Sequence, residues 1–117
     1  MAGSATVTRH GSGVKVHTVA WTSDASGNCD AGVVHIDGQL QRVVTDPSGT
    51  AAPTDDYDIT LVDEDGYDIA GGQLANRDTA NTETVVLTAA LLHYGNVTVT
   101  VANAGNAKSG TIKLYVR

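Results

Sequence analysis

The amino-acid sequence predicts an all-β fold, namely a single-domain antiparallel β-sandwich of about eight strands with Greek-key or jelly-roll-like connections. Apolar and polar residues alternate over short runs, which is typical of strands with one buried face. Turn-forming residues, among them 13 glycines, separate these runs at regular spacing. The best helical candidate, residues 88–93, covers little more than one turn. Residues 1–117 therefore form one domain with one core.

The first half of the chain carries four candidate strands. Residues 5–8 form a short β-prone start, and glycines separate them from a long alternating run over residues 14–21. Residues 33–37 and 40–44 alternate in the same way on either side of a glycine, which indicates a turn or bulge. The segment 46–55 contains both prolines of the chain, so we expect a long connection between two sheets rather than an interior strand.

The second half is predicted to contain two hairpins. Residues 57–62 alternate, residues 63–66 have turn chemistry, and residues 67–69 begin a returning strand. After a loop and a strand over residues 83–87, the runs 97–101 and 112–116 are expected to pair around an Asn/Gly turn. The Greek-key prediction follows from these hairpins and the long connection before them.

The inward positions of these strands define the predicted core. Trp21 is the only tryptophan in a chain without phenylalanine, so we expect it to anchor the core; a sugar-stacking or partner-binding tryptophan is the alternative. The predicted core residues are Val14, Val16, Trp21, Val34, Ile36, Ile59, Leu61, Val97, Val99, Val101, Ile112, Leu114 and Val116.

Composition narrows the possible partners and compartments. The formal net charge of -6 argues against a nucleic-acid partner, because phosphate neutralisation needs an excess of Lys and Arg. Cys29 is the single cysteine, so it cannot form an intramolecular disulfide, and we expect it to be a bystander rather than a nucleophile. The first six residues lack the features of a secretory signal, and no apolar run approaches the roughly 20 residues of a membrane span. We therefore expect no membrane partner and folding in a reducing cytoplasm.

Acidic residues are concentrated in the first predicted hairpin. One interpretation, without a binding role, is a solvated loop that keeps the protein soluble. The alternative is a docking surface formed by Asp63, Glu64 and Asp65 at the turn. Between residues 55 and 68 there are seven acids and no basic residue: Asp55, Asp56, Asp58, Asp63, Glu64, Asp65 and Asp68.

No motif predicts catalysis, a cofactor or a metal. The four histidines match no zinc-ligand spacing, although His17 and His35 could meet across neighbouring strands with Asp37 close by. The acids around Gly66 fail the EF-hand pattern, because the glycine falls at the wrong position. There is no nucleophile elbow, P-loop or dinucleotide fingerprint, so we predict a protein that is not an enzyme.

Three stretches resemble a family of small tailed-bacteriophage virion proteins. They are PTDDYDITLVDEDG (53–66) taken together with NRDTANT (76–82) as one interrupted stretch, WTSD (21–24), and the two closing strands with their Asn/Gly turn (97–117). The resemblance implies a structural protein of the virion, assembled in the cytoplasm of the host bacterium. A decoration, or cement, protein would bind the major capsid protein and further copies of itself, as a homotrimer, and would stabilise the assembled capsid.

Two alternatives remain open at this stage. The same stretches are compatible with a neck or tail component of the virion. A β-sandwich with exposed aromatic residues could instead be a carbohydrate-binding module.

The amino-terminal residues are the other predicted interface. Residues 1–10 could form an interaction arm, because they precede a glycine-containing break and the first eight are small, β-prone and uncharged. Such an arm could pair with the edge of a foreign sheet. The alternative is a first strand paired within its own sheet. The interface residues are Met1, Ala2, Gly3, Ser4, Ala5, Thr6, Val7 and Thr8.

Overall fold

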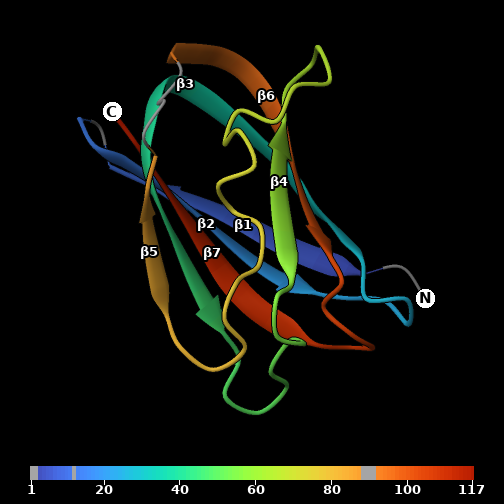
Figure 1. Cartoon of the computed structure of the whole chain (residues 1–117). Coiled ribbons are helices and arrows are strands. Elements are labelled where there is room, and N and C mark those ends of the chain that lie inside the picture. The colour runs from blue at the N-terminus through green and yellow to red at the C-terminus, as the bar shows by residue number, and fades with distance from the viewer. Residues whose placement is uncertain (1–2, 12, 88–91) are drawn as a thin grey trace.

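The computed structural model describes residues 3–11, 13–87 and 92–117, and its strands confirm the predicted all-β fold. No described residue lies in a helix, so the described part of the chain contains no helix that could span a membrane. Figure 1 shows the strands β1 (Ser4–His10), β2 (Lys15–Thr22), β3 (Cys29–Pro47), β4 (Asp58–Val62), β5 (Glu83–Val86), β6 (Leu92–Ala102) and β7 (Ser109–Val116).

The strand β3 connects the two layers of the fold. Its first half pairs with β6, and its second half pairs with β7 on one side and β5 on the other. Gly38 lies between the halves with a φ of 154°, which favours glycine, so residues 33–37 and 40–44 form one bent strand instead of two. With the halves of β3 counted separately, the antiparallel sheet has eight strands and is nearly closed into a barrel.

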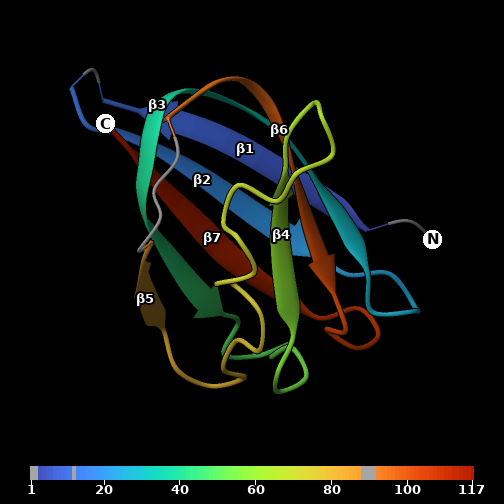
Figure 2. The ribbon, with the colours of Figure 1, turned by 45° about the horizontal axis from the view of Figure 1, so that its top comes forward.

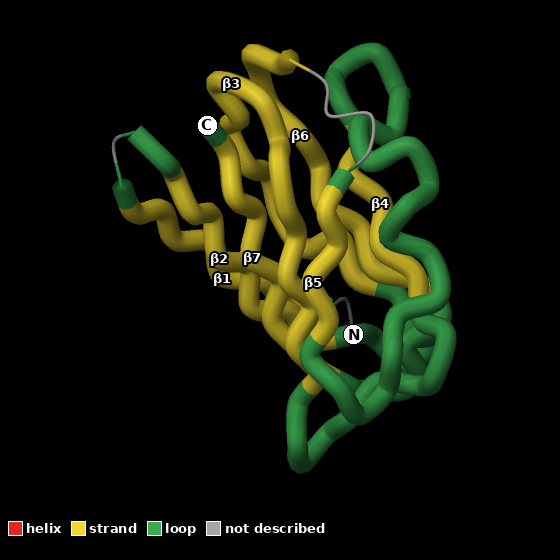
Figure 3. The backbone as a smooth tube through the Cα atoms, turned by 60° about the vertical axis from the view of Figure 1, so that its left-hand side comes forward, coloured by secondary structure: helices red, strands yellow, loops and turns green. Residues whose placement is uncertain are grey.

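The connections between strands repeatedly cross from one layer to the other. The strand order is β1-β2-β7-β3-β6-β4, with β5 beside β3. The strands β1, β2 and β7 run side by side in Figures 1 and 2, and Figure 3 shows them facing the layer that contains β4 and β6. Loops cover the outer edge of β4 in the same view. The described chain therefore wraps around a single core.

Two predicted hairpins differ from the structure. The strand β7 pairs with β2 and β3 instead of β6, so the hairpin over residues 97–116 was wrong. The connection after β6 contains Asn103 and Ala107 at positive φ, and a backbone hydrogen bond from Ala104 to Gly27 fixes it to the loop after β2. In the acidic hairpin, the returning segment makes only the bridge between Val62 and Asp68 before it continues as a loop along β4.

The core lies between the layers and confirms most of the predicted residues. Val14 and Val16 are corrections: Val14 is 53% exposed and Val16 is half-buried, whereas Lys15, His17, Val19 and Trp21 face inward. A shift of one residue moves the whole alternating set of a strand to the other face. The predicted residues that are buried are Trp21, Val34, Ile36, Ile59, Leu61, Val97, Val99, Val101, Ile112, Leu114 and Val116.

Candidate functional site

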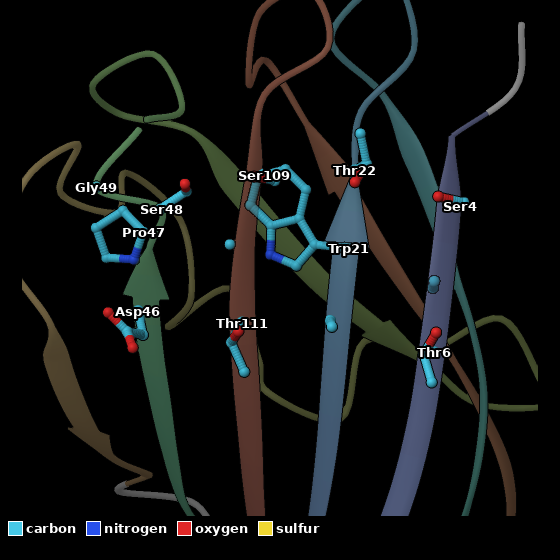
Figure 4. Close-up of a pocket in the computed structure, with 13 residues that line it drawn as sticks. Ser4, Thr6, Trp21, Thr22, Asp46, Pro47, Ser48, Gly49, Ser109 and Thr111 are labelled. Carbon is cyan, nitrogen blue, oxygen red and sulfur yellow. The ribbon is translucent and has the colours of Figure 1, made fainter. Parts of the chain in front are cut away.

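A shallow trough crosses the outer face of β1, β2, β7 and the end of β3. Its volume is about 590 Å³, and one row of paired residues, Thr6, Ala20, Thr111 and Asp46, runs across it. Figure 4 shows the side chains of four strands and the turn after β3 around this space. The residues with hydroxyl groups that line it are Ser4, Thr6, Thr22, Ser48, Ser109 and Thr111.

Small residues create the trough. Ala20 projects from the outer face of β2 and leaves the middle of the row shallow. On the inner face, a Cβ atom at Gly110 would lie 3.0 Å from Cζ2 of Trp21, so the glycine makes room for the indole ring. The large aromatic side chain therefore fills the core behind β2 and β7, on the face opposite the trough.

Trp21 borders the trough but is not available to a ligand. Its side chain is 2% exposed, and its ring lies 5.7 Å from the ring of Tyr57, which is also buried. Burial raises the pKa of Tyr57 to about 12. The predicted role of Trp21 as a core anchor is confirmed, and a sugar-stacking role for its ring is excluded by burial.

The trough offers neutral hydrogen-bonding groups rather than catalytic ones. Its lining residues include no histidine, cysteine, lysine or arginine. Its one carboxylate, on Asp46, accepts a hydrogen bond of 2.9 Å from the Thr82 hydroxyl. A nucleophile needs a base within hydrogen-bonding reach, and the one carboxylate that lines the trough is hydrogen-bonded to Thr82, which is not a lining residue. The arrangement fits the binding of a polar surface or an extended polypeptide.

The structure places the predicted amino-terminal interface in β1. Ser4–His10 pairs with β2 along its whole length, as in the alternative of a first strand paired within its own sheet, and an interaction arm over residues 1–10 stays a prediction. Ser4, Ala5 and Thr6 line the trough, and Val7 is 37% exposed. Met1 and Ala2 lie outside the described residues, and Gly3 lies against Cys29.

The second predicted interface, the acidic turn, lies in the other layer. The carboxylate of Asp63 accepts hydrogen bonds from the backbone N–H groups of Asp65 and Tyr67, each of 2.9 Å. Glu64 accepts a hydrogen bond of 2.9 Å from the backbone N–H of Asn96, which ties the turn to β6. Glu64 and Asp65 are exposed, so these acids form a solvated turn, and the structure does not bring them together with residues 4–8.

A cluster of polar side chains joins β1 and β2 to Asp37 of β3, and the sequence analysis named His17 and Asp37 but missed Lys15 and Arg9. Lys15 donates hydrogen bonds of 2.8 Å to both the carbonyl and the carboxylate of Asp37, and Arg9 lies 3.7 Å from the same carboxylate. The bond from Lys15 is the main cause that lowers the pKa of Asp37. His17 is 2% exposed, and burial, followed by the charge of Arg9, lowers its pKa.

The other candidate residues do not form a reactive site. His35 is exposed and makes an edge contact with Tyr94, at 5.0 Å between ring centroids. Over residues 3–11, 13–87 and 92–117, no group of His, Cys, Asp and Glu side chains could hold a metal ion. Cys29 is buried, its thiol lies 3.5 Å from the carbonyl of Ser4, and burial raises its pKa. A protonated, buried thiol is a poor nucleophile.

Comparisons with known proteins identify no family. No protein-family model matches the chain, and no curated protein matches it. Among solved structures, the chain is similar to a cupin domain from Bordetella pertussis Tohama I, with a TM-score of 0.36 and 14% sequence identity. The match covers 100% of this chain and 97% of that chain.

Proposed function

We propose that this protein is a non-enzymatic structural component of a tailed-bacteriophage virion, where it acts as a decoration protein on the assembled capsid. The resemblance of residues 53–66 and 97–117 to small virion proteins supports this proposal. A protein that binds only the assembled shell stabilises the shell in proportion to its occupancy, so no catalytic group is needed.

The observation that carries the proposal is the trough across the outer face of β1, β2 and β7. Its hydroxyl groups can donate and accept hydrogen bonds with a polypeptide backbone of any sequence. The strand β1 pairs only with β2, and the start of β3 approaches its other edge at Ala5 and Val7. The exposed outer face of β1, at Ser4 and Thr6, therefore borders the trough. A strand or loop of the major capsid protein would lie across Ala20 and contact β1.

The test is to fill the trough. Ala20→Arg places a long side chain at the exposed centre of the row without touching the core. We expect this variant to fold normally and to lose binding to capsids that lack the protein, measured by co-sedimentation. Thr98→Arg is the matched control, because Thr98 is exposed on β6 in the other layer. Full capsid binding by Ala20→Arg would refute the role of the trough.

The copy number in purified virions separates the capsid from the neck or tail. On the order of hundreds of copies are expected for a capsid decoration protein, whereas about six to twelve indicate a neck or tail component. Absence from the virion would refute the proposal as a whole.

One observation favours a carbohydrate-binding function as the second candidate. Tyr94 is 81% exposed, and the edge contact with His35 holds its ring in place. Exposed aromatic rings can stack on sugars. A glycan array tests this candidate: binding that Tyr94→Ala abolishes would support it, and an array without hits would remove it.

A further inference from the structure

A second depression lies on the outer face of the β1–β2–β7 layer, at the end opposite the trough. Val14, Gln41, Tyr115, Val116 and Arg117 line it, with a volume of about 190 Å³. Exposed apolar side chains lie on two sides of the depression: Val14, which lines it, is 53% exposed, and Val86, which pairs with Arg42 of β3, is 68% exposed. Exposed apolar residues around a depression are typical of interaction sites.

Cations without ion pairs accompany this apolar surface. The guanidinium carbon of Arg42 lies 4.1 Å from the centre of the Tyr115 ring, and Lys113 projects from the same face two residues before Tyr115. Neither Arg42 nor Lys113 forms a salt bridge with a described residue. Asp46, the acid on this face of β3, lies at the far end in the trough. The depression therefore attracts an acidic partner with an apolar side chain.

The acidic turn of the same chain has the complementary chemistry. Tyr67 is 56% exposed, and Asp65, two residues before it in the turn, is also exposed. The turn is rigid, because Asp63 donates its backbone N–H to the carbonyl of Tyr67 over 2.9 Å and its carboxylate accepts two further backbone hydrogen bonds. Glu64 ties the turn to β6. A turn that is already ordered loses little conformational entropy when it binds.

We propose that the acidic turn of one copy docks into this depression on a second copy. The ring of Tyr67 packs against Val14 and Tyr115, and Asp65 faces Arg42 and Lys113. The occupant is a second copy because this chain carries both complementary surfaces. These two surfaces differ, so the contact is head-to-tail, and successive contacts form a closed ring or an open chain. This self-association goes beyond the proposed capsid function and does not depend on it.

Sedimentation velocity at protein concentrations from about 10 µM to 1 mM tests the proposal. We expect the average mass of the wild type to rise with concentration, and to rise less in about 1 M NaCl, which screens exposed charges. Tyr67→Ala and Val14→Asp should remain monomeric. Val33→Asp and Tyr94→Ala are the matched controls, because Val33 is 56% and Tyr94 81% exposed outside both surfaces, and they should associate like the wild type.

A mixture of the two monomeric variants tests the head-to-tail geometry. Tyr67→Ala keeps an intact depression, and Val14→Asp keeps an intact turn. An equimolar mixture should therefore form a dimer of one copy of each variant and grow no further. Three results would overturn the proposal: a wild type that is monomeric at every concentration, a mixture that stays monomeric, or a Val33→Asp control that also fails to associate.

Discussion

Lys15 and His17 occupy inward positions of β2 that aliphatic side chains fill in most strands of this fold. Lys15 retains hydrogen bonds to Asp37 at 2.8 Å, which compensates for the loss of water around its ammonium group. His17 has no such compensation, because its Nε2 atom is buried and finds no partner among the described residues. A buried imidazole without a partner is better tolerated when it is neutral.

His17 should make stability depend on pH. Its pKa in the folded protein is below the unfolded value of 6.5, so the unfolded state binds the proton first as the pH falls. The contribution of neutral His17 is fully present above pH 6.5 and is lost as the pH falls from there toward the folded pKa. Urea unfolding between about pH 8 and about pH 5 should show this loss in the wild type and a smaller loss in His17→Leu. Equal pH dependence in both proteins would contradict the assignment.

Trp21 should be the most costly aromatic side chain to truncate in β2. Its ring is 2% exposed and packs near Tyr57, so Trp21→Ala leaves a cavity that the surrounding strands cannot fill. We expect a loss of about 3 to 5 kcal/mol in the free energy of unfolding, measured by denaturant titration. Val33→Ala, at a 56% exposed position, should change stability by less than about 0.5 kcal/mol. An unchanged unfolding midpoint for Trp21→Ala would show that the ring is exposed in solution.

At the scale of the strand, the bend in β3 depends on one residue. A Cβ atom at Gly38 would lie 2.6 Å from the carbonyl oxygen of Arg117, and its φ of 154° disfavours other residues. Gly38→Ala should therefore cost about 1 to 3 kcal/mol in thermal or denaturant unfolding. Gly49→Ala is the control, because nothing lies within 4 Å of a Cβ atom there. Similar stability of the two variants would mean that the bend tolerates a side chain.

Deletion of residues 1–8 tests the role of β1. Residues Ser4–His10 pair with β2, and Ala5 packs against the core. We therefore expect the truncated chain to lose a large part of the roughly 5 to 15 kcal/mol of a typical domain, visible as a lower thermal midpoint. An unchanged midpoint would instead support a separable arm that contributes to binding and not to folding.

Alternation predicted which strands exist more reliably than which strands pair. The inward faces of β4, β6 and β7 were correct, because their apolar residues have no competing apolar set on the other face. In β2, the predictions for Val14 and Val16 conflicted with the prediction for Trp21, because Trp21 lies an odd number of positions from each valine. The structure follows Trp21, and Lys15 on the same face is accommodated by its hydrogen bond to Asp37 from a distant part of the chain.

The candidate site was predictable only in part, because it depends on which strands pair. Ser4 and Thr6 were predicted interface residues, and they do line the trough. Ala20 and Thr111 lie side by side in the trough because β2 pairs with β7. The sequence instead favoured a hairpin between residues 97–101 and 112–116. The acidic turn was predicted correctly, because its hydrogen bonds are almost all local.

At the scale of the whole molecule, charge is distributed unevenly between the layers. The acids of residues 55–68 flank β4, whereas the first layer carries most of the basic residues. This separation lets one molecule present two surfaces of opposite charge. The basic residues in or directly after the strands β1, β2, β3 and β7 are Arg9, Lys15, Arg42, Lys113 and Arg117.

The topology also predicts slow folding. Lys15 pairs with Val116, so β2 and β7 join nearly the two ends of the described chain. The chain must lose the entropy of closing this long loop before the contacts between the two strands stabilise it. We expect refolding in stopped-flow fluorescence, followed through Trp21, to take about milliseconds to seconds. Leu114→Ala in β7 should mainly accelerate unfolding if this pairing forms late. Two results would show that the distant strands meet early: refolding within microseconds, or a slowing of folding by Leu114→Ala that accounts for its whole loss of stability.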